Sequence, residues 1–489
     1  MSAKENNKKI VAGGGVILFL LIVLGLSFYP SFTADTYIHF NRTWMESAIN
    51  MSRRNGRPFT SLFFILMGSL HQAPELYLLI SSCLALCFLG LSVWCLARLF
   101  EKTEVASSLM APFLSLIILV NPFIISYFLY VERGIMMFAV LMAILATYIR
   151  ICKPVTHWLL VSIVLATVSM LTYQSFTSLY LMLCLCFAVE KRDVKAAIRS
   201  FLISSIPFVV SGLISLLYLK FFGIGRFDLE NLGLLARMLR FLKTLIKSYI
   251  LGFNIGPDGF ILISLLLAIG YLLWRVKRQQ KGTTAEKTRA KLILLALPLL
   301  FLLPCALSLV AKTGSGARST YSAACSVGLF LLLARLDFKK AKLVKGTLVT
   351  LYLAVLSLTF NKIFLQQIVV TQLDQNRMQV VQQMVRDYEE KTQVKVTKRA
   401  TYTDAHPQLD NQYTDFIDSH SGILNTGNLV KSPVTNLLPF SIYTYMTGEN
   451  LERVERDSAI KAYFKSKDWS TFSPDQIIIK GDTIHMAVY

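Results

Sequence analysis

Long apolar segments recur through the first 366 residues, and they limit the possible folds more than any other feature of the chain. Each is close to the roughly 20 residues that an α-helix needs to cross the hydrocarbon core of a bilayer. Charged residues make up only 16% of the sequence, whereas a soluble domain carries roughly a quarter. The sequence therefore predicts an α-helical polytopic membrane protein with about eleven transmembrane helices. Their approximate ranges are 10–29, 76–97, 108–129, 135–151, 157–173, 176–189, 199–222, 258–274, 292–310, 321–337 and 346–366.

Clusters of lysine and arginine occupy every second loop, and this alternation predicts the orientation of the chain. Short cytoplasmic loops carry an excess of these residues, so we place the clusters and the N-terminus in the cytoplasm and the C-terminus outside. Residues 56–70 are apolar over only about 14 positions. Counting them as a span would invert every later loop, so we predict an interfacial or re-entrant element there. The basic clusters lie at residues 8–9, 98–102, 150–153, 191–199, 275–281 and 339–345.

The spans divide the chain into a membrane domain, residues 1–366, and an extracytoplasmic domain, residues 367–489. Residues 10–29 could be taken for a signal peptide, but no small-residue cleavage site follows them, so we keep them as the first span. Two longer outer loops cover residues 30–74 and 223–257. The C-terminal domain is a small α/β domain, in which periodicity predicts a helix over 374–390 and strands at 394–397, 476–479 and 483–488, the last two joined as a hairpin at Gly481-Asp482.

Charge and cysteine content exclude several classes of site. A net charge of +21 would suggest a nucleic-acid partner in a soluble protein; here it favours orientation signals and contact with anionic lipid, so we expect a lipid bilayer and no nucleic acid. All eight cysteines lie in or beside apolar segments, without disulfide or zinc-ligand spacing. No phosphate-binding loop, dinucleotide fingerprint or Asp-x-Asp pair occurs. We predict no metal and no cofactor.

The first outer loop carries the most informative polar residues. Asp35 stands about five residues beyond the first span and is followed by Tyr37, His39, Trp44 and a basic run that ends at Arg57. A carboxylate under an aromatic loop suits a general base for a hydroxyl nucleophile, and arginine binds phosphate with two parallel hydrogen bonds. The alternative is that Asp35 only caps a helix that begins near Tyr37.

The second outer loop predicts an amphipathic helix. Arg237, Arg240, Lys243 and Lys247 recur at helical spacing among leucines, so we expect the helix to lie in the interface with its basic side towards lipid phosphates. Anchoring to bulk anionic lipid is the alternative. A specific phosphate site would explain why these cations lie outside, against the usual bias.

Three further groups of polar residues are predicted at the outer edge. Glu132-Arg133 is an ionisable pair in the turn after the third span, where such residues are often functional; a structural ion pair or an arginine that snorkels to the interface is the alternative. Tyr173-Gln174 occupies the next outer turn. Arg318 follows a glycine-rich stretch that could carry it to a substrate.

The arrangement of the spans and several short motifs of the chain resemble those of one known family. A first span, an outer loop with a proximal Asp, about ten further spans and an outer C-terminal domain resemble the C-type membrane glycosyltransferases. Within that class, the chain resembles the Gtr-type bacterial glucosyltransferases, which modify O-antigens and similar surface glycans. The resemblance covers roughly residues 10–365, with a single Asp where many relatives carry an Asp-Asp pair. It rests on Asp35-Thr36-Tyr37, Trp44, Gly56-Arg57, Asn121-Pro122-Phe123 and Tyr173-Gln174-Ser175.

The resemblance implies an inverting hexosyltransferase, specifically a glucosyltransferase, in the bacterial cytoplasmic membrane. Asp35 would be the catalytic base. The donor would be a polyprenyl-phosphate-linked sugar and the acceptor a cell-surface or lipid-linked glycan. Two alternatives remain open: a flippase for lipid-linked oligosaccharides, and a glycan polymerase or ligase that uses a diphosphate-linked donor. The donor phosphate would be held by Arg57, Arg237, Arg240 and Arg318, with Tyr37, His39, Trp44, Glu132, Arg133, Tyr173 and Gln174 around the substrates.

Overall fold

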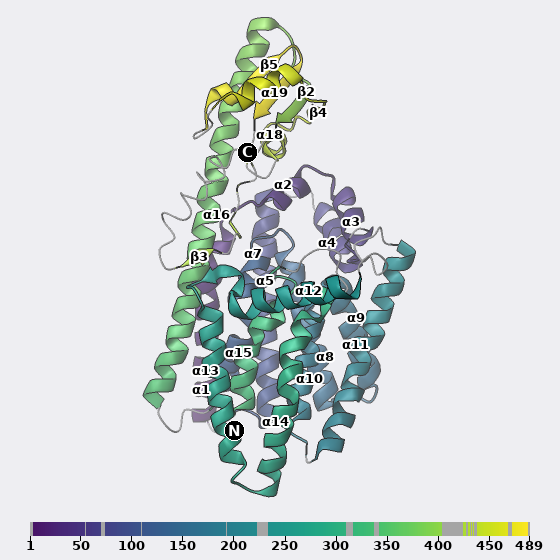
Figure 1. The fold of residues 1–489 in the computed structure, drawn as a ribbon, viewed down its shortest axis with the longest axis vertical. Helices are drawn as coiled ribbons and strands as arrows, with labels where there is room; N and C mark the ends of the chain where they lie inside the picture. The colour runs from purple at the N-terminus through teal and green to yellow at the C-terminus, as the bar shows by residue number, and fades with distance from the viewer. Residues whose placement is uncertain are drawn as a thin grey trace. The chain divides into compact units, whose positions relative to one another are not determined.

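The structure is a computed structural model of the 489-residue chain (Figure 1). It describes residues 3–487 apart from 54, 70–73, 109, 192, 223–232, 310–315, 337–341, 403–423, 427–428, 431, 433, 435–437 and 468–471. Parts of both outer loops, of the glycine-rich stretch before Arg318 and of the C-terminal domain therefore lie outside the described residues.

The chain divides into two compact units. Unit 1 consists of Met1–Phe28 and Met45–Asn361, and unit 2 consists of Tyr29–Trp44 and Lys362–Tyr489. The first outer loop is therefore split: its beginning belongs to the same unit as the C-terminal part of the chain.

Unit 1 is a bundle of apolar helices. Among the described residues, six helices are long and apolar enough to cross a membrane, or seven if the bent pair Met110–Leu119 and Pro122–Phe128 counts as one span. The helices of the bundle are α1 (Ala3–Leu24), α5 (Pro74–Lys102), α6 (Met110–Leu119), α7 (Ile125–Phe128), α8 (Arg133–Cys152), α9 (Trp158–Thr172), α10 (Thr177–Ala188), α11 (Val194–Phe222), α13 (Phe260–Gln279), α14 (Thr284–Leu302), α15 (Tyr321–Leu333) and the first part of α16 (Lys342–Thr392).

Helices α10 and α15 form the interior of unit 1. Every residue of α10 is buried, and α15 packs against α6, α10 and α13. The approach of α15 to α6 requires a residue without a side chain, because a Cβ added to Gly328 would lie 2.5 Å from the Cγ1 atom of Ile118. The interior of the bundle is therefore tightly packed where α15 crosses α6.

The third predicted span is broken, and the break shapes the outer end of the bundle. Asn121 ends α6: its Oδ1 accepts a hydrogen bond from the Phe123 N–H at 3.0 Å, while its Nδ2 donates to the Ile118 carbonyl at 3.1 Å. Pro122 then begins the short helix η2 (Pro122–Ile124). The chain turns by 49° at this point before α7. This bend places Tyr127 inside the bundle, where it is fully buried.

Shorter helices surround the end of unit 1 that lies away from the N-terminus (Figure 1). The segment predicted as interfacial or re-entrant is a helix of only 12 residues, α4, whose Thr60 hydroxyl donates to the Thr172 carbonyl at 3.1 Å. Helix α12 runs crosswise to the long helices (Figure 1). The set comprises α3 (Trp44–Arg53), α4 (Pro58–Ser69), α12 (Leu234–Leu245), η4 (Ile246–Ile250), β1 (Ile255–Gly256) and the turns η1 (Gly25–Phe28), η3 (Gln174–Phe176), η5 (Gly252–Asn254) and η6 (Leu303–Leu309).

Unit 2 is built on the far part of α16. This helix has 51 residues, which is about 76 Å at 1.5 Å per residue and far exceeds a hydrocarbon core of roughly 30 Å. The predicted helix over 374–390 is its continuation. The other elements are α2 (Ala34–Phe40), α18 (Pro439–Thr447), α19 (Ser458–Lys465), η7 (Pro474–Gln476) and the strands β2 (Lys398–Tyr402), β3 (Asn425–Thr426), β4 (Glu452–Arg453), β5 (Ile477–Lys480) and β6 (Thr483–Ala487).

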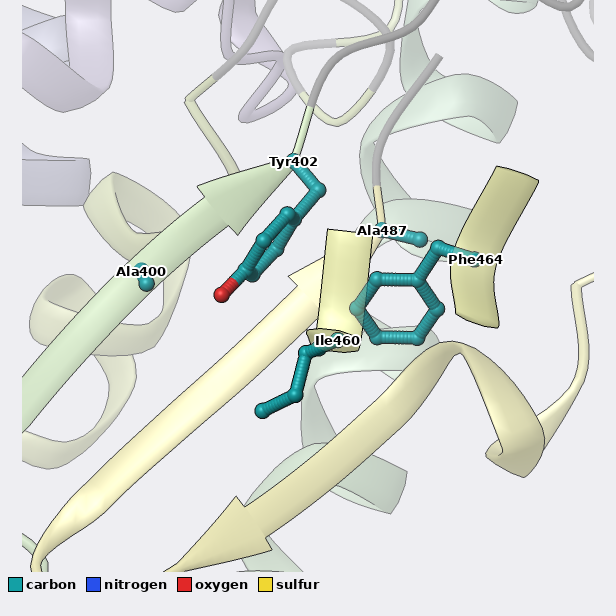
Figure 2. Packing of buried hydrophobic residues seen from close by; sticks show 5 residues of the cluster. All are labelled: Ala400, Tyr402, Ile460, Phe464 and Ala487. Atoms are coloured by element: carbon teal, nitrogen blue, oxygen red, sulfur yellow. The ribbon is translucent and has the colours of Figure 1, made fainter. Parts of the chain in front are cut away.

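A four-stranded mixed sheet in the order β4-β2-β6-β5 completes unit 2. The predicted hairpin at Gly481-Asp482 is confirmed, because β5 and β6 pair antiparallel around it, and β2 runs parallel to both of its neighbours. Helix α19 covers one face, where Tyr402 packs edge-on against Phe464 at 5.1 Å (Figure 2). The strand predicted at 394–397 is wrong by four residues. There the Val396 N–H bonds to the Glu389 side chain at 2.7 Å, and pairing begins only at Lys398.

Candidate functional site

Asp35 lies in the first turn of α2, in unit 2. The proposed cap role is wrong: Thr33 is the N-cap, and its hydroxyl and that of Thr36 each accept a hydrogen bond from the other residue's backbone N–H. The helix begins at Ala34 rather than near Tyr37. The Thr33 hydroxyl already accepts the hydrogen bond of the N-cap, so the exposed carboxylate of Asp35 is not needed to cap the helix.

The rest of α2 is anchored within unit 2. The Phe32 N–H donates to the Thr371 hydroxyl at 3.0 Å, and Gln367 Nε2 donates to the Phe32 carbonyl at 2.9 Å. Tyr37 is fully buried, packs edge-on against Tyr445 at 5.4 Å and accepts a hydrogen bond from Gln375. Burial raises the pKa of Tyr37 well above its usual range. The anchored helix therefore holds Asp35 on a fixed backbone.

The other predicted residues of the first loop lie around this helix. His39 is buried, and Trp44 is half-buried and packs edge-on against Phe40 at 6.2 Å. Of the predicted residues in unit 2, only Asp35 is exposed on α2. The structure therefore presents the carboxylate to its surroundings and uses Tyr37 and His39 for packing.

In unit 1, Arg57 and the pair Tyr173-Gln174 come together. The Arg57 guanidinium carbon lies 4.0 Å from the centroid of the Tyr173 ring, a cation–π stack. Gln174 Nε2 donates to the Gly56 carbonyl at 3.3 Å, which ties the turn before Arg57 to the start of η3. The Arg57 Nε atom is buried and has no hydrogen-bond partner among the described residues. Arg57 is therefore positioned by its neighbours while part of its donor capacity is unused.

Arg318 joins the same region through a buried tyrosine. Its guanidinium carbon lies 3.5 Å from the centroid of the Tyr130 ring. The Tyr127 hydroxyl donates to the Arg318 carbonyl oxygen and lies 3.0 Å from the Ser175 hydroxyl. The Tyr127 ring packs edge-on against Tyr173 at 5.4 Å. Tyr127 thus links the segments that carry the two predicted phosphate-binding arginines, which are far apart in the sequence, and a guanidinium group can hold an anionic oxygen group.

Glu132 and Arg133 lie inside unit 1 rather than at its surface. Arg133 is fully buried, and its Nη1 donates to the Ser27 carbonyl at 2.8 Å and to the Ser82 hydroxyl at 3.1 Å. Its Nε donates to the Tyr130 carbonyl at 3.0 Å. Glu132 is 4% exposed. This geometry favours the structural alternative for Arg133, which joins η1, α5 and the turn that carries Tyr130.

The amphipathic helix predicted in the second outer loop is present as α12. Helix α12 exposes its apolar side, with Leu234 and Leu235 exposed to 76% and 72%, whereas Arg237 and Arg240 are half-buried. They share a helix face with the buried Thr244. In a bilayer the leucine side is the one that lipid covers, so the two arginines face unit 1 and not the lipid. Only Lys243 and Lys247 remain exposed.

Sequence reasoning missed Tyr127 and Tyr130, which connect the arginines. Both lie at the end of an apolar segment, where a tyrosine commonly marks the membrane interface. The one available signal was Asn121-Pro122, since an asparagine and a proline inside an apolar run indicate a broken helix. Within the part of the chain that the structure describes, no three His, Cys, Asp or Glu residues are grouped to hold a metal ion.

One comparison with known proteins identifies the chain. The family model of Glucosyl transferase GtrII matches residues 32–334, more than half of the chain, and this range contains Asp35 and all four predicted phosphate-binding arginines. No curated protein and no solved structure matches the chain. The chain belongs to the GtrII glucosyltransferase family, and it is a multi-pass membrane enzyme of the C-type glycosyltransferase class that acts in O-antigen modification.

Proposed function

We propose that the protein moves a glucosyl group from a polyprenyl-phosphate-linked donor to a surface polysaccharide or lipid-linked glycan, with inversion, on the outer face of the bacterial cytoplasmic membrane. One observation carries the donor assignment. The Arg57 guanidinium stacks on Tyr173 at 4.0 Å and that of Arg318 on Tyr130 at 3.5 Å, and Tyr127 contacts both the Tyr173 ring and the Arg318 carbonyl oxygen. Stacked guanidinium groups keep their N–H edges directed away from the ring, and that edge binds phosphate oxygens in pairs.

The chemistry follows from a base and a cationic phosphate site. Asp35 takes the proton from an acceptor hydroxyl as that oxygen attacks the anomeric carbon of the donor. The bond between this carbon and the phosphate oxygen breaks, and its electron pair stays on the phosphate. Arg57 and Arg318, with Arg237 and Arg240 from the inward side of α12, stabilise the negative charge that develops there. Attack in line with the departing phosphate inverts the configuration.

Packing within unit 2 supports a topology of eleven spans. The hydrogen bond between Phe32 and Thr371 requires the first loop and the C-terminal unit to lie on the same side of the membrane. The chain must then cross an even number of times between them. Ten further spans satisfy this condition: the seven counted above with α16 among them, plus the shorter apolar helices at 158–172, 174–188 and 321–333. Counting α4 as an additional span would make the number of crossings odd.

We therefore propose a membrane domain over residues 1–366 with a cytoplasmic N-terminus, and an extracytoplasmic domain over 367–489. The first span is Gly13–Phe28 with the residues before it. Helix α4, of 12 residues, lies in or re-enters the outer interface. The basic clusters then face the cytoplasm, in agreement with the positive-inside rule.

An Asp35→Asn variant tests the assignment of the base. Purified protein is given a polyprenyl-monophosphate glucose and an acceptor glycan, and transfer is measured alongside a folding control. We expect turnover to fall by at least about a hundredfold, within the range that a general base contributes. The matched control is Glu46→Gln, since Glu46 is also an exposed acid in the first turn of a loop helix. Equal turnover by Asp35→Asn and Glu46→Gln contradicts the assignment.

The choice of donor distinguishes the proposed glucosyltransferase from a glycan polymerase or ligase and from a flippase. A glycan polymerase or ligase uses a diphosphate-linked oligosaccharide, and a flippase moves the lipid without forming a glycosidic bond. We expect product only from the monophosphate-linked glucose. Product from the diphosphate-linked donor alone would assign the polymerase or ligase instead.

A further inference from the structure

A polar pocket at the edge of the unit 2 sheet has no part in the proposed reaction. It measures about 520 Å³ and lies beside the outer strand β4 and the segment that follows it. Three of its five lining residues are charged: the lining consists of Arg453, Glu455 and Arg456 with Thr401 and Val454. A concave site with a few convergent polar groups is the form that ligand sites take.

The strand register pairs Arg453 of the pocket lining with a second arginine. Arg399 of β2 pairs directly with Arg453 of β4. Directly paired residues point to the same face of a sheet, and like charges in that position destabilise it. Burial and the neighbouring Arg453 charge lower the pKa of Arg399. Among the described residues Arg453 forms no ion pair that would relieve this repulsion.

The arginines next to Arg453 are fixed in place. Arg399 Nε donates to the Leu451 carbonyl at 3.1 Å, and its guanidinium carbon lies 5.3 Å from the Phe440 ring centroid. Arg456 Nε donates to the Thr401 carbonyl at 2.8 Å. Guanidinium groups held by Nε and by ring contacts cannot separate freely to lower their repulsion. The positive potential at this edge is therefore built into the fold.

We propose that this pocket binds an anionic group, a phosphate or carboxylate, on the carbohydrate polymer that the enzyme glucosylates. The proposal rests on the proposed function for its carbohydrate partner. A bound anion would offset the repulsion between the paired Arg399 and Arg453, and arginine is the residue that recognises such oxygens with paired hydrogen bonds. Glu455 and Thr401 add an acceptor and a hydroxyl that suit sugar hydroxyls beside the anion. Unit 2 thereby supplies a binding site for an acidic acceptor chain.

Binding of a matched pair of glycans tests this proposal. The full-length protein, in nanodiscs of neutral phosphatidylcholine, is titrated with a phosphorylated oligosaccharide and with the same oligosaccharide after phosphatase treatment. We expect the phosphorylated glycan to bind at least about tenfold more tightly, as the loss of a charge-assisted hydrogen bond implies. Equal affinity for the two glycans overturns the proposal. Equally tight binding of inorganic phosphate overturns the carbohydrate part of it.

An Arg453→Gln variant supplies a second, independent readout. It should lose that preference for the phosphorylated glycan, while its melting temperature without ligand stays the same or rises, because the repulsion with Arg399 is gone. The control is Lys467→Gln, an exposed cation outside the pocket lining, which should change neither property. Unchanged glycan affinity in Arg453→Gln overturns the proposal. The Arg453→Gln variant should still transfer glucose to an unphosphorylated acceptor. If the unaltered protein transfers no glucose to that acceptor, the proposed function has failed, and not the proposal about the pocket.

Discussion

The hydroxyl of Tyr127 donates a hydrogen bond to the backbone carbonyl oxygen of Arg318. The same hydroxyl lies 3.0 Å from that of Ser175, and the Tyr127 ring packs against Tyr173, on which Arg57 stacks. One buried side chain thus connects the two arginine-bearing segments. If Arg57 and Arg318 bind the donor phosphate together, Tyr127 sets the spacing between them.

Replacing Tyr127 by phenylalanine should therefore weaken donor binding without removing the base. Tyr127→Phe keeps the ring but loses the bond to the Arg318 carbonyl. A net hydrogen bond contributes about 0.5–1.5 kcal/mol, so we expect the KM for the donor to rise about two- to tenfold, with little change in kcat or in the KM for the acceptor. Steady-state transfer kinetics with both substrates varied give these constants.

Tyr321→Phe is the matched control for that experiment. Tyr321 is equally buried, belongs to the same aromatic cluster and donates to the Leu119 carbonyl at 2.5 Å. Its hydroxyl therefore bonds to α6 and not to the Arg318 carbonyl that Tyr127 contacts. A general loss of packing would affect both variants alike, so equal donor KM values in the two variants would contradict a positioning role for Tyr127.

Lysine should not replace arginine at position 57. Arg57→Lys keeps the charge but loses the planar group that stacks on Tyr173 and binds phosphate through two nitrogens. We expect the donor KM to rise about tenfold. Arg98→Lys is the comparison, because Arg98 also lies over an aromatic ring, that of Trp94 at 5.6 Å, but pairs with Glu101 away from the cluster. A similar KM for Arg57→Lys and for the unaltered protein would remove Arg57 from the donor site.

The orientation of α12 predicts different effects for two neighbouring cations. Arg240 is half-buried and faces unit 1, whereas Lys243 is exposed. If α12 supplies charge to the donor phosphate, Arg240→Gln should lower kcat/KM for the donor by about tenfold, and Lys243→Gln should leave it unchanged. Equal losses in both variants would mean that the helix acts only through its attraction to anionic lipid.

The sequence could predict the elements that depend on local pattern. Apolar length alone located the buried α10 and α15, because a helix surrounded by other helices or by lipid needs apolar residues on every side. The hairpin at Gly481-Asp482 followed from alternation and a turn pair, and Gly481 has the positive φ of 59° that such a turn needs. These features require no knowledge of distant contacts.

What could not be predicted depends on contacts across long stretches of sequence. Phe32 and Thr371 are 339 positions apart, and no local pattern indicates that the first loop packs on the far part of α16. The surroundings of α12 could not be predicted for a related reason: local pattern identifies its two faces, but which of them meets protein depends on neighbouring helices. At the start of α2, Thr33 and Asp35 are both good caps, and only the reciprocal bonds of Thr33 with Thr36 decide between them.

The stability of unit 2 should depend on pH through Asp374. This carboxyl is buried on α16 beyond the apolar part of the helix, and both of its oxygens accept from the Ser432 hydroxyl at 2.7 and 2.8 Å. Burial raises its pKa from 3.8 to about 7, although the Ser432 bond opposes this. A pKa raised by folding favours the folded state when the group is protonated. The free energy of unfolding should therefore be highest below pH 4 for this group and fall as pH rises to about 7.

An Asp374→Asn variant should flatten that dependence, because the amide has no charge to bury. Thermal unfolding between pH 4 and pH 8 measures it, and the variant should gain stability relative to the unaltered protein at the upper end. Asp387→Asn, at an exposed position of the same helix, should retain the original profile. If stability depends on pH in the same way in Asp374→Asn and in the unaltered protein, groups other than Asp374 cause the pH dependence.

The donor is the central claim, and a direct transfer assay tests it best. Purified protein in a bilayer is given an acceptor glycan together with radiolabelled glucose on either a short polyprenyl monophosphate or a uridine diphosphate. The account predicts labelled, inverted product from the lipid-linked donor, its loss in a variant lacking both Arg57 and Arg318, and none from the nucleotide sugar. Transfer from the nucleotide sugar, or undiminished transfer by the double variant, would contradict it.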